Sequence, residues 1–551
     1  MSPAARDLAR GVLLPLLVLG GLSGFANAWP TLWPQPRLAL SVELAGALLV
    51  LVLAAAWQRR PPTRLVRALA LIATAGVALH YIDVTVPAVL GRRVNLYWDL
   101  PHLGAVTGMD GSGAAGWRTV VAVLLAGALL VVLYRIVRAC FAALAQRATR
   151  PLVGWSLGAG CVATLLLWGA ASGMGSAAWM ARLFAPPVSA MVAEQIRFLH
   201  SALARDASAL RLGAGPRFVG NLDALGGADV LIVFAEAYGA VTFDQPSLAA
   251  ALATSRARFA AAIERSGRTV VSARVVSPTF GGASWLAHGA LLAGIDTRDP
   301  ADHALLLSTD RPTLVRHFSA HGYRTVGWMP GLQRPWPEGR FYGFERIADA
   351  DGGGYAGLPF GFWRIPDQAS MALIHEQEFG GRFAGEPAPG AGRSVGAPRR
   401  PRLVVFPTVS THAPFAALPP LAEDWSRLTG AEAFSREAVA AAEALPVSWT
   451  DALPAYLAAM RYQFGWLTAY VADHAPADLV LIVIGDHQPI GAVSGPEQPW
   501  EVPVHVVSRD RALLARLERA GFVPGLMPAQ PPLGPMHWLT QVLVDAFSAE
   551  P

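Results

Sequence analysis

The stretch LVLIVIGDHQP, from Leu479 to Pro489, decides the fold that we expect for this chain. Its apolar run is mostly β-branched and unbroken up to Gly485, which is typical of a parallel strand buried on both faces. Asp486 and His487 follow at the carboxyl end of this strand, where open α/β sheets bind ligands. Carboxylate and imidazole both bind divalent cations. Alone, such a pair is equally typical of a surface turn, so the other strand ends must be read with it.

Apolar strand-like runs alternate with helical patterns from Ala228 to the end of the chain. This alternation predicts an α/β domain with a doubly wound, mainly parallel sheet. The expected strands cover residues 230–234, 269–276, 325–328, 403–409, 479–485 and 502–508, and the clearest helices cover residues 245–265, 284–292 and 538–547.

The first third of the chain has a different character, and it accounts for much of the 53% hydrophobic content. Five apolar stretches predict a transmembrane bundle, although a span needs about 20 residues and the fourth stretch is short. The stretches cover residues 11–28, 38–57, 68–90, 119–134 and 152–174. Arginine-rich flanks mark alternate loops as cytoplasmic, so we expect everything after Met174 to lie outside the cytoplasmic membrane.

The first apolar stretch has a second interpretation, because it ends in Ala26-Asn27-Ala28 and so also resembles a cleavable signal peptide. The arginine pattern favours an uncleaved anchor. The expected organisation is therefore a five-helix anchor (1–176), an amphipathic juxtamembrane linker (177–222) and an extracytoplasmic catalytic domain (223–551).

Composition excludes two classes of function. The formal net charge is +5, but all 44 basic residues are arginines that are dispersed or flank apolar segments, which argues against a nucleic-acid partner. Both cysteines, Cys140 and Cys161, lie in the apolar third. The predicted catalytic domain therefore has neither a disulfide framework nor a thiol nucleophile.

Three further polar residues follow predicted strands: Glu236 after the first, Ser284 beyond a glycine pair after the second, and His412 after the fourth. Parallel strands bring their carboxyl ends to one edge, so these residues should meet Asp486 and His487 there. Glu236, Asp486 and His487 would leave a metal with an open position, as catalytic sites require.

Ser284 is the candidate nucleophile, because a bound cation lowers the pKa of a hydroxyl. The helix that it opens directs amide groups toward an incoming phosphate or sulfate. His412 is the candidate proton donor to the leaving oxygen, and Arg334 the candidate partner of an anionic group. Each has a structural alternative: a helix cap for Ser284, a helix-start carboxylate for Glu236, a turn residue for His412 and a solvated cation for Arg334.

Five stretches carry a family resemblance: VLIVFAEAYG, FGGASWLAHGALLAG, HGYRTVGWMPG with RFYGFER, STHAPF and VIGDHQP. With the apolar third, they resemble the alkaline phosphatase superfamily and, within it, the polytopic sulfatase-like enzymes typified by lipoteichoic acid synthase. The resemblance implies one divalent cation (Mn²⁺, Mg²⁺ or Zn²⁺) on Glu236, Ser284, Asp486 and His487. It also implies that Ser284 is the nucleophile and that His412 and Arg334 contact the substrate.

Two departures narrow the activity. Ser284 stands where the family usually has threonine, and Ser284-Trp285-Leu286-Ala287-His288 lacks the Pro and Arg of formylglycine sulfatases. Phosphoethanolamine transferases usually carry disulfides, which this domain cannot form. We expect a transferase that moves a phosphoglycerol-type group from a phospholipid to an envelope glycan. The alternatives are a phosphodiesterase or sulfatase-like hydrolase, a phosphoethanolamine transferase, and a scaffold that has lost the chemistry.

Overall fold

The computed structural model describes residues 3–27, 29–37, 39–58, 61–95, 99, 115–173, 183–203, 212–333, 336–380 and 399–549. These residues form two compact units, one from the first 204 positions and one from the remainder of the chain. The predicted boundaries at 176/177 and 222/223 stay predictions.

The first unit is helical. Its helices are α1–η1–α2 (Pro3–Gly24, continuous), α3 (Val42–Gln58), α4 (Thr63–Leu90), α7 (Ala115–Ala148), α8 (Pro151–Gly173) and α10 (Val188–Leu203). Within the described ranges, four apolar helices are long enough to cross a membrane, whereas α3 has only 17 residues. The fourth predicted stretch, which looked short at 119–134, is the core of the 34-residue helix α7. The apolar helices anchor the chain in a membrane, as the sequence predicts.

The first apolar segment packs inside this unit. Val12 and Leu19 are buried in the same cluster as Leu48 and Phe141. Asp7 forms an ion pair with Arg147. In this arrangement Val12 and Leu19 supply part of the core of the helical unit.

The second unit is built on one eight-stranded sheet, as the strand-and-helix alternation predicts. Its order is β10-β4-β9-β8-β3-β7-β5-β6. The strands are β3 (Val230–Ala235), β4 (Thr269–Val276), β5 (Arg324–Trp328), β6 (Arg346–Ala348), β7 (Arg402–Pro407), β8 (Val480–Gly485), β9 (Glu501–Ser508) and β10 (Val523–Pro524). Five neighbouring strands from β8 to β6 are parallel, while β9 is antiparallel to both β8 and β4.

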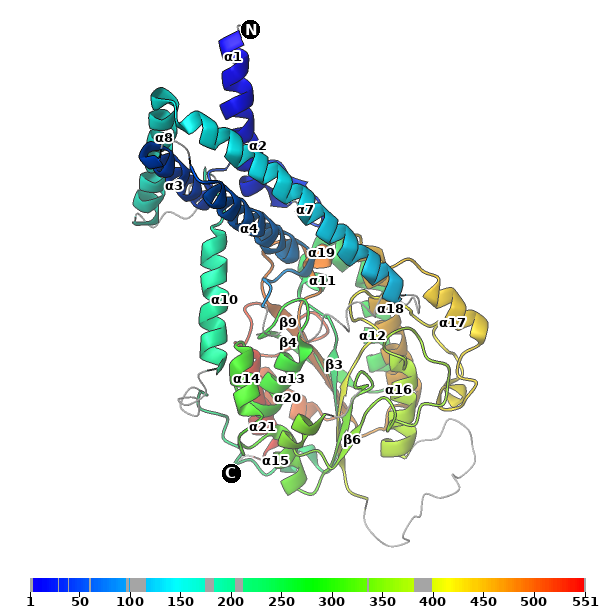
Figure 1. Ribbon diagram of the computed structural model, residues 1–551. Coiled ribbons are helices and arrows are strands. Elements are labelled where there is room, and N and C mark those ends of the chain that lie inside the picture. Colours follow the sequence, from blue (N-terminus) through cyan, green and yellow to red (C-terminus); the bar gives the residue numbers. More distant parts are fainter. Residues whose placement is uncertain are drawn as a thin grey trace. The chain divides into compact units, whose positions relative to one another are not determined.

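Helices cover both faces of the sheet. In Figure 1, α13, α14, α15, α20 and α21 lie on one side of the strands and α12, α16 and α18 lie on the other. The bounds are α11 (Val241–Asp244), α12 (Pro246–Arg265), α13 (Ser284–Ala293), α14 (Pro300–Leu306), α15 (Leu314–Ala320), α16 (Asp367–Ile374), α17 (Arg436–Glu443), α18 (Leu453–Ala469), α19 (Gly491–Ser494), α20 (Arg511–Arg519) and α21 (Met536–Phe547). Strands β3 and β8 are buried at every position, which explains their unbroken apolar sequences.

The direction of β4 is important for the site. Because β4 is antiparallel to β9 and β9 is antiparallel to β8, strands β4 and β8 run in the same direction. The carboxyl ends of β3, β4, β7 and β8 therefore lie at one edge of the sheet. This edge carries the predicted site residues.

Candidate active and metal-binding site

Four predicted residues meet at the carboxyl edge of the sheet. Ligand atoms of Glu236, Asp486 and His487 all lie within 4.8 Å of one another. The Ser284 hydroxyl donates a hydrogen bond of 2.7 Å to Glu236 Oε2, and its oxygen lies 3.2 Å from His487 Nε2. Segments separated by up to 251 positions in the chain thus form one constellation.

Strand register brings the metal-type ligands together. Ala235 at the end of β3 pairs with Gly485 at the end of β8, so Glu236 and Asp486 follow on adjacent strands. Gly485 has no room for a side chain, because a Cβ there would lie 1.9 Å from the Tyr238 carbonyl oxygen. The close approach of the turn after β3 therefore requires glycine at this position.

Ser284 is presented by a left-handed turn. Gly281, Gly282 and Ala283 have φ angles of 64°, 142° and 61°. Such angles suit glycine and strain alanine. Helix α13 then begins at Ser284, as predicted, so the hydroxyl lies at the positive end of the helix dipole.

Asp486 is 1% exposed, and the backbone hydrogen bonds that hold its carboxylate both reach the same oxygen. Its Oδ1 accepts hydrogen bonds from the amides of Ala237 (2.9 Å) and His487 (2.7 Å). Its Oδ2 is buried and has no hydrogen-bond partner among the residues that the structure describes. Burial and the neighbouring Glu236 carboxylate raise the pKa of Asp486 well above its usual value.

The His487 ring supplies the positive charge beside these carboxylates. Its Nδ1 donates to the Gln488 carbonyl at 2.7 Å, and its Nε2 lies 3.2 Å from Glu236 Oε1. Burial alone would lower the pKa of His487, but Asp486 and Glu236 raise it to about 9. Burial would likewise raise the pKa of Glu236, but His487 and His412 hold it below the usual range.

These residues fit a divalent cation. Two buried carboxylates and an imidazole nitrogen are ligands that Mn²⁺, Mg²⁺ or Zn²⁺ accepts in various proportions. The partnerless Asp486 Oδ2 is the atom that such a cation would satisfy. The described residues therefore include a group able to hold a metal ion, with a serine hydroxyl beside it.

His412 lies close to this group, near enough for its charge to lower the pKa of Glu236. Its Nδ1 donates to the Ala413 carbonyl at 2.6 Å, so Nε2 is the ring atom available to a substrate. The His412 ring packs against Trp363, with 4.6 Å between the ring centroids. Arg334, the predicted anion partner, lies outside the described residues.

The sequence reasoning missed the residues that hold these groups in place. The Thr408 hydroxyl oxygen accepts a hydrogen bond from the Glu236 amide at 3.0 Å. Asp367 and Gln463 accept hydrogen bonds from the segment that leads to His412. Asp367 opens a helix, which looks like an ordinary helix-start carboxylate in sequence. The contacts of Asp367 and Gln463 become visible only when α16 and α18 are placed against the segment that follows β7.

No protein-family model matches the sequence, and no curated protein matches it. Solved structures that resemble the chain include a Vibrio parahaemolyticus protein in the alkaline phosphatase superfamily, with a TM-score of 0.34, 14% identity and coverage of 54% of this chain and 63% of that chain. Another is the lipoteichoic acid synthase LtaP from Listeria monocytogenes (TM-score 0.32, 13% identity, 54% and 68% covered).

A third is the Streptococcus pyogenes phosphoglycerol transferase GacH in complex with sn-glycerol-1-phosphate (TM-score 0.31, 10% identity, 59% and 88% covered). The chain thus spans less than two thirds of the Vibrio protein. The TM-scores of these three matches are all 0.34 or lower.

Proposed function

We propose that this chain is a membrane-anchored, metal-dependent transferase that moves a phosphoglycerol-type group from a phospholipid to an envelope glycan, outside the cytoplasmic membrane. One observation carries the proposal. The Ser284 hydroxyl, at the start of α13, lies within hydrogen-bond distance of both Glu236 and His487. This is the arrangement of an activated nucleophile next to an anion-binding helix end.

Glu236, Asp486, His487 and the Ser284 hydroxyl would hold the metal ion. When bound, a divalent cation lowers the pKa of a hydroxyl and neutralises charge on a phosphoryl group. Glu236 and His487 orient the Ser284 oxygen toward the substrate. Helix α13 contributes its positive dipole end where the phosphoryl oxygens would lie.

The reaction would have two steps. Ser284 Oγ forms a bond to phosphorus while the bond from phosphorus to the diacylglycerol oxygen breaks. The hydroxyl proton leaves to solvent, and His412 Nε2 gives a proton to the departing oxygen. In the second step an acceptor hydroxyl attacks phosphorus and gives its proton to His412. The bond from phosphorus to Ser284 Oγ breaks, and the Ser284 oxygen takes a proton back from solvent. A lipid donor accounts for a catalytic domain tethered to apolar helices.

The test uses full-length protein in phospholipid nanodiscs with head-group-labelled phosphatidylglycerol and Mn²⁺. We expect release of diacylglycerol and a phosphoglycerol ester on the peptide that contains Ser284, detected by mass spectrometry. Ser284→Ala should abolish both. Diacylglycerol release with free glycerol phosphate, in the presence of glycan acceptor, would identify a hydrolase instead.

Ser435→Ala is the matched control. Ser435 caps α17 through a 3.2 Å hydrogen bond from the Ala438 amide, so its loss removes a helix cap without touching the site. Equal activities in Ser284→Ala and wild-type protein would refute the nucleophile. A substrate whose head group never appears on Ser284 would refute the phosphoglycerol assignment.

A further inference from the structure

We propose that Asp367 is a positioning residue that acts on the reaction through His412. The inference rests on the proposed function, because His412 is the proton donor and acceptor in that reaction. Asp367 begins α16 and is completely buried. It is neither a predicted metal ligand nor the predicted nucleophile. A buried carboxylate is costly to a fold unless its contacts compensate.

The Asp367 carboxylate binds two consecutive backbone amides just beyond β7. Its Oδ1 accepts from the Val409 amide at 2.8 Å, and its Oδ2 accepts from the Ser410 amide at 3.0 Å. The Asp367 amide in turn lies 3.4 Å from Ser410 Oγ. Both carboxylate oxygens are thus used to fix one short stretch of backbone.

This stretch leads directly to His412. The His412 amide donates to the Val409 carbonyl at 3.1 Å, so the anchored residue also closes the turn that carries the imidazole. The ring is then set by its own hydrogen bond from Nδ1 to the Ala413 carbonyl. A shift of the Val409 and Ser410 amides would therefore move His412 Nε2.

A second helix holds the same turn from another side. Gln463 of α18 is buried, and its Oε1 accepts from the Thr411 hydroxyl at 2.9 Å. Thr408, at the start of the turn, accepts the Glu236 amide. Residues 408–411 thus connect His412 to Glu236, a predicted metal ligand. Asp367 accepts hydrogen bonds from the two middle residues of this segment, Val409 and Ser410.

Asp367→Asn tests this role with little change in shape. Asparagine offers one acceptor oxygen, so it can bind one of the two amides and must present an NH2 group to the other. The turn should loosen while Glu236, Ser284, Asp486 and His487 keep their contacts. A misplacement of about 1 Å at a reacting group can cost on the order of 10²-fold in rate.

The experiment is a double-mutant cycle on full-length protein in detergent, with Mn²⁺ and bis-p-nitrophenyl phosphate alongside labelled phosphatidylglycerol. We expect Asp367→Asn to lower kcat by about 10- to 100-fold, with KM and Mn²⁺ affinity changed less than about 3-fold. In a His412→Gln background the same substitution should cost less than about 3-fold, because the group through which it acts is already gone.

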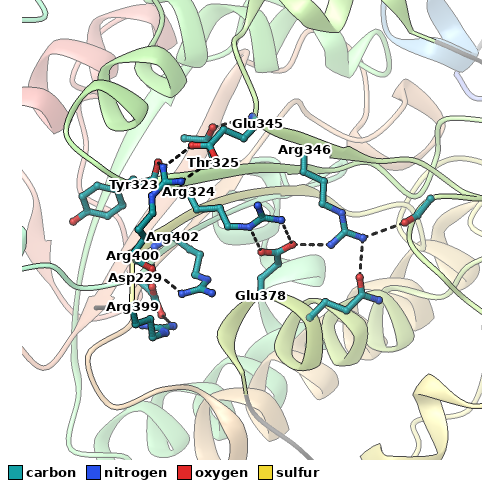
Figure 2. Close-up of polar contacts among 12 residues, drawn as sticks. Asp229, Tyr323, Arg324, Thr325, Glu345, Arg346, Glu378, Arg399, Arg400 and Arg402 are labelled. Atoms are coloured by element: carbon teal, nitrogen blue, oxygen red, sulfur yellow. Dashed lines mark hydrogen bonds and ion pairs between the residues drawn. The ribbon is translucent and has the colours of Figure 1, made fainter. Parts of the chain in front are cut away.

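Asp229→Asn is the matched control. Asp229 is also fully buried and accepts a hydrogen bond from the Arg402 amide at 2.8 Å, at the end of β7 opposite to the Val409 and Ser410 amides. Figure 2 shows Asp229 beside Arg399, with which it forms an ion pair, and Arg402, at the edge of the sheet where the parallel strands begin. Its loss should lower stability and leave kcat per folded molecule unchanged.

Full kcat in Asp367→Asn would overturn the inference, and so would an equal loss in the wild-type and His412→Gln backgrounds. If Asp367→Asn does not fold, Asp367→Glu carries the same prediction, because the longer side chain displaces the carboxylate that binds the Val409 and Ser410 amides. Wild-type protein that is inactive on both substrates would refute the proposed function. Wild-type protein that is active, with additive effects in the cycle, would refute the inference alone.

Discussion

Replacing Gly485 by alanine should separate the predicted metal ligands without changing any of them. A Cβ at this position would lie 1.9 Å from the Tyr238 carbonyl oxygen and 3.1 Å from the Val502 Cβ. Non-bonded carbon and oxygen approach to about 3.3 Å, so the end of β8 and the turn after β3 must part by roughly 1.4 Å. That turn follows Glu236, whereas β8 delivers Asp486 and His487.

A displacement of this size exceeds the tolerance of about 0.5 Å that a preorganised site allows. We expect Mn²⁺ affinity to fall by at least about 10-fold and phosphodiester cleavage by about 100-fold. Forcing a methyl group into a packed site should also cost about 3 kcal/mol of unfolding free energy. Calorimetric Mn²⁺ titration, turnover and thermal unfolding of the full-length protein measure the three quantities.

Gly430→Ala is the control for the loss of a glycine. Its φ of −102° suits any residue, and among the described atoms a Cβ there would meet only the Arg427 carbonyl oxygen, at 3.6 Å. This variant should match wild-type protein in all three measurements. Wild-type Mn²⁺ affinity and turnover in Gly485→Ala would refute the argument that close approach of β8 and the turn after β3 builds the site.

Three other predictions concern charge and metal. Burial raises the pKa of Asp367 to about 6, so the folded state holds this proton more tightly than the unfolded state does. As pH falls from about 7.5 to about 5, the unfolding free energy of wild-type protein should rise by about 1.4 kcal/mol relative to that of Asp367→Asn. Thermal unfolding at the two pH values measures this difference. Glu378 is 1% exposed and pairs with both Arg324 and Arg346 (Figure 2), so Glu378→Gln should lower the unfolding free energy by about 3 kcal/mol in denaturant titrations and leave Mn²⁺ affinity intact. Mn²⁺ at about 100 times its Kd should raise the unfolding free energy of wild-type protein by about 2.7 kcal/mol, and a chelator should reverse this gain in thermal unfolding. In Asp486→Asn, neither Mn²⁺ nor the chelator should shift the melting curve.

Much of the second unit could be predicted from local sequence. The apolar runs at 230–234 and 479–485 correspond to β3 and β8, because a strand buried on both faces needs apolar residues at every position. The helix predicted from Ser284 begins there. Polar residues at the ends of such runs stand out for the same reason, which is why Glu236 and Asp486 could be recognised as candidates.

The helical unit was less well predicted at its edges. The helix α7 extends well beyond the apolar stretch 119–134, because arginine and alanine continue a helix as well as leucine does. Hydropathy therefore marked the centre of this helix and missed its ends.

By itself, the sequence determined which segments are strands, which are apolar helices, and which residue types stand where strands end. These are consequences of burial and backbone preference over a few neighbouring residues. Only the tertiary structure decided that β4 runs in the same direction as β8, that Ser284 lies 2.7 Å from Glu236, and that Asp367 holds the turn of His412. Those contacts join positions tens to hundreds of residues apart, and they depend on strand order and helix packing, which no local pattern encodes.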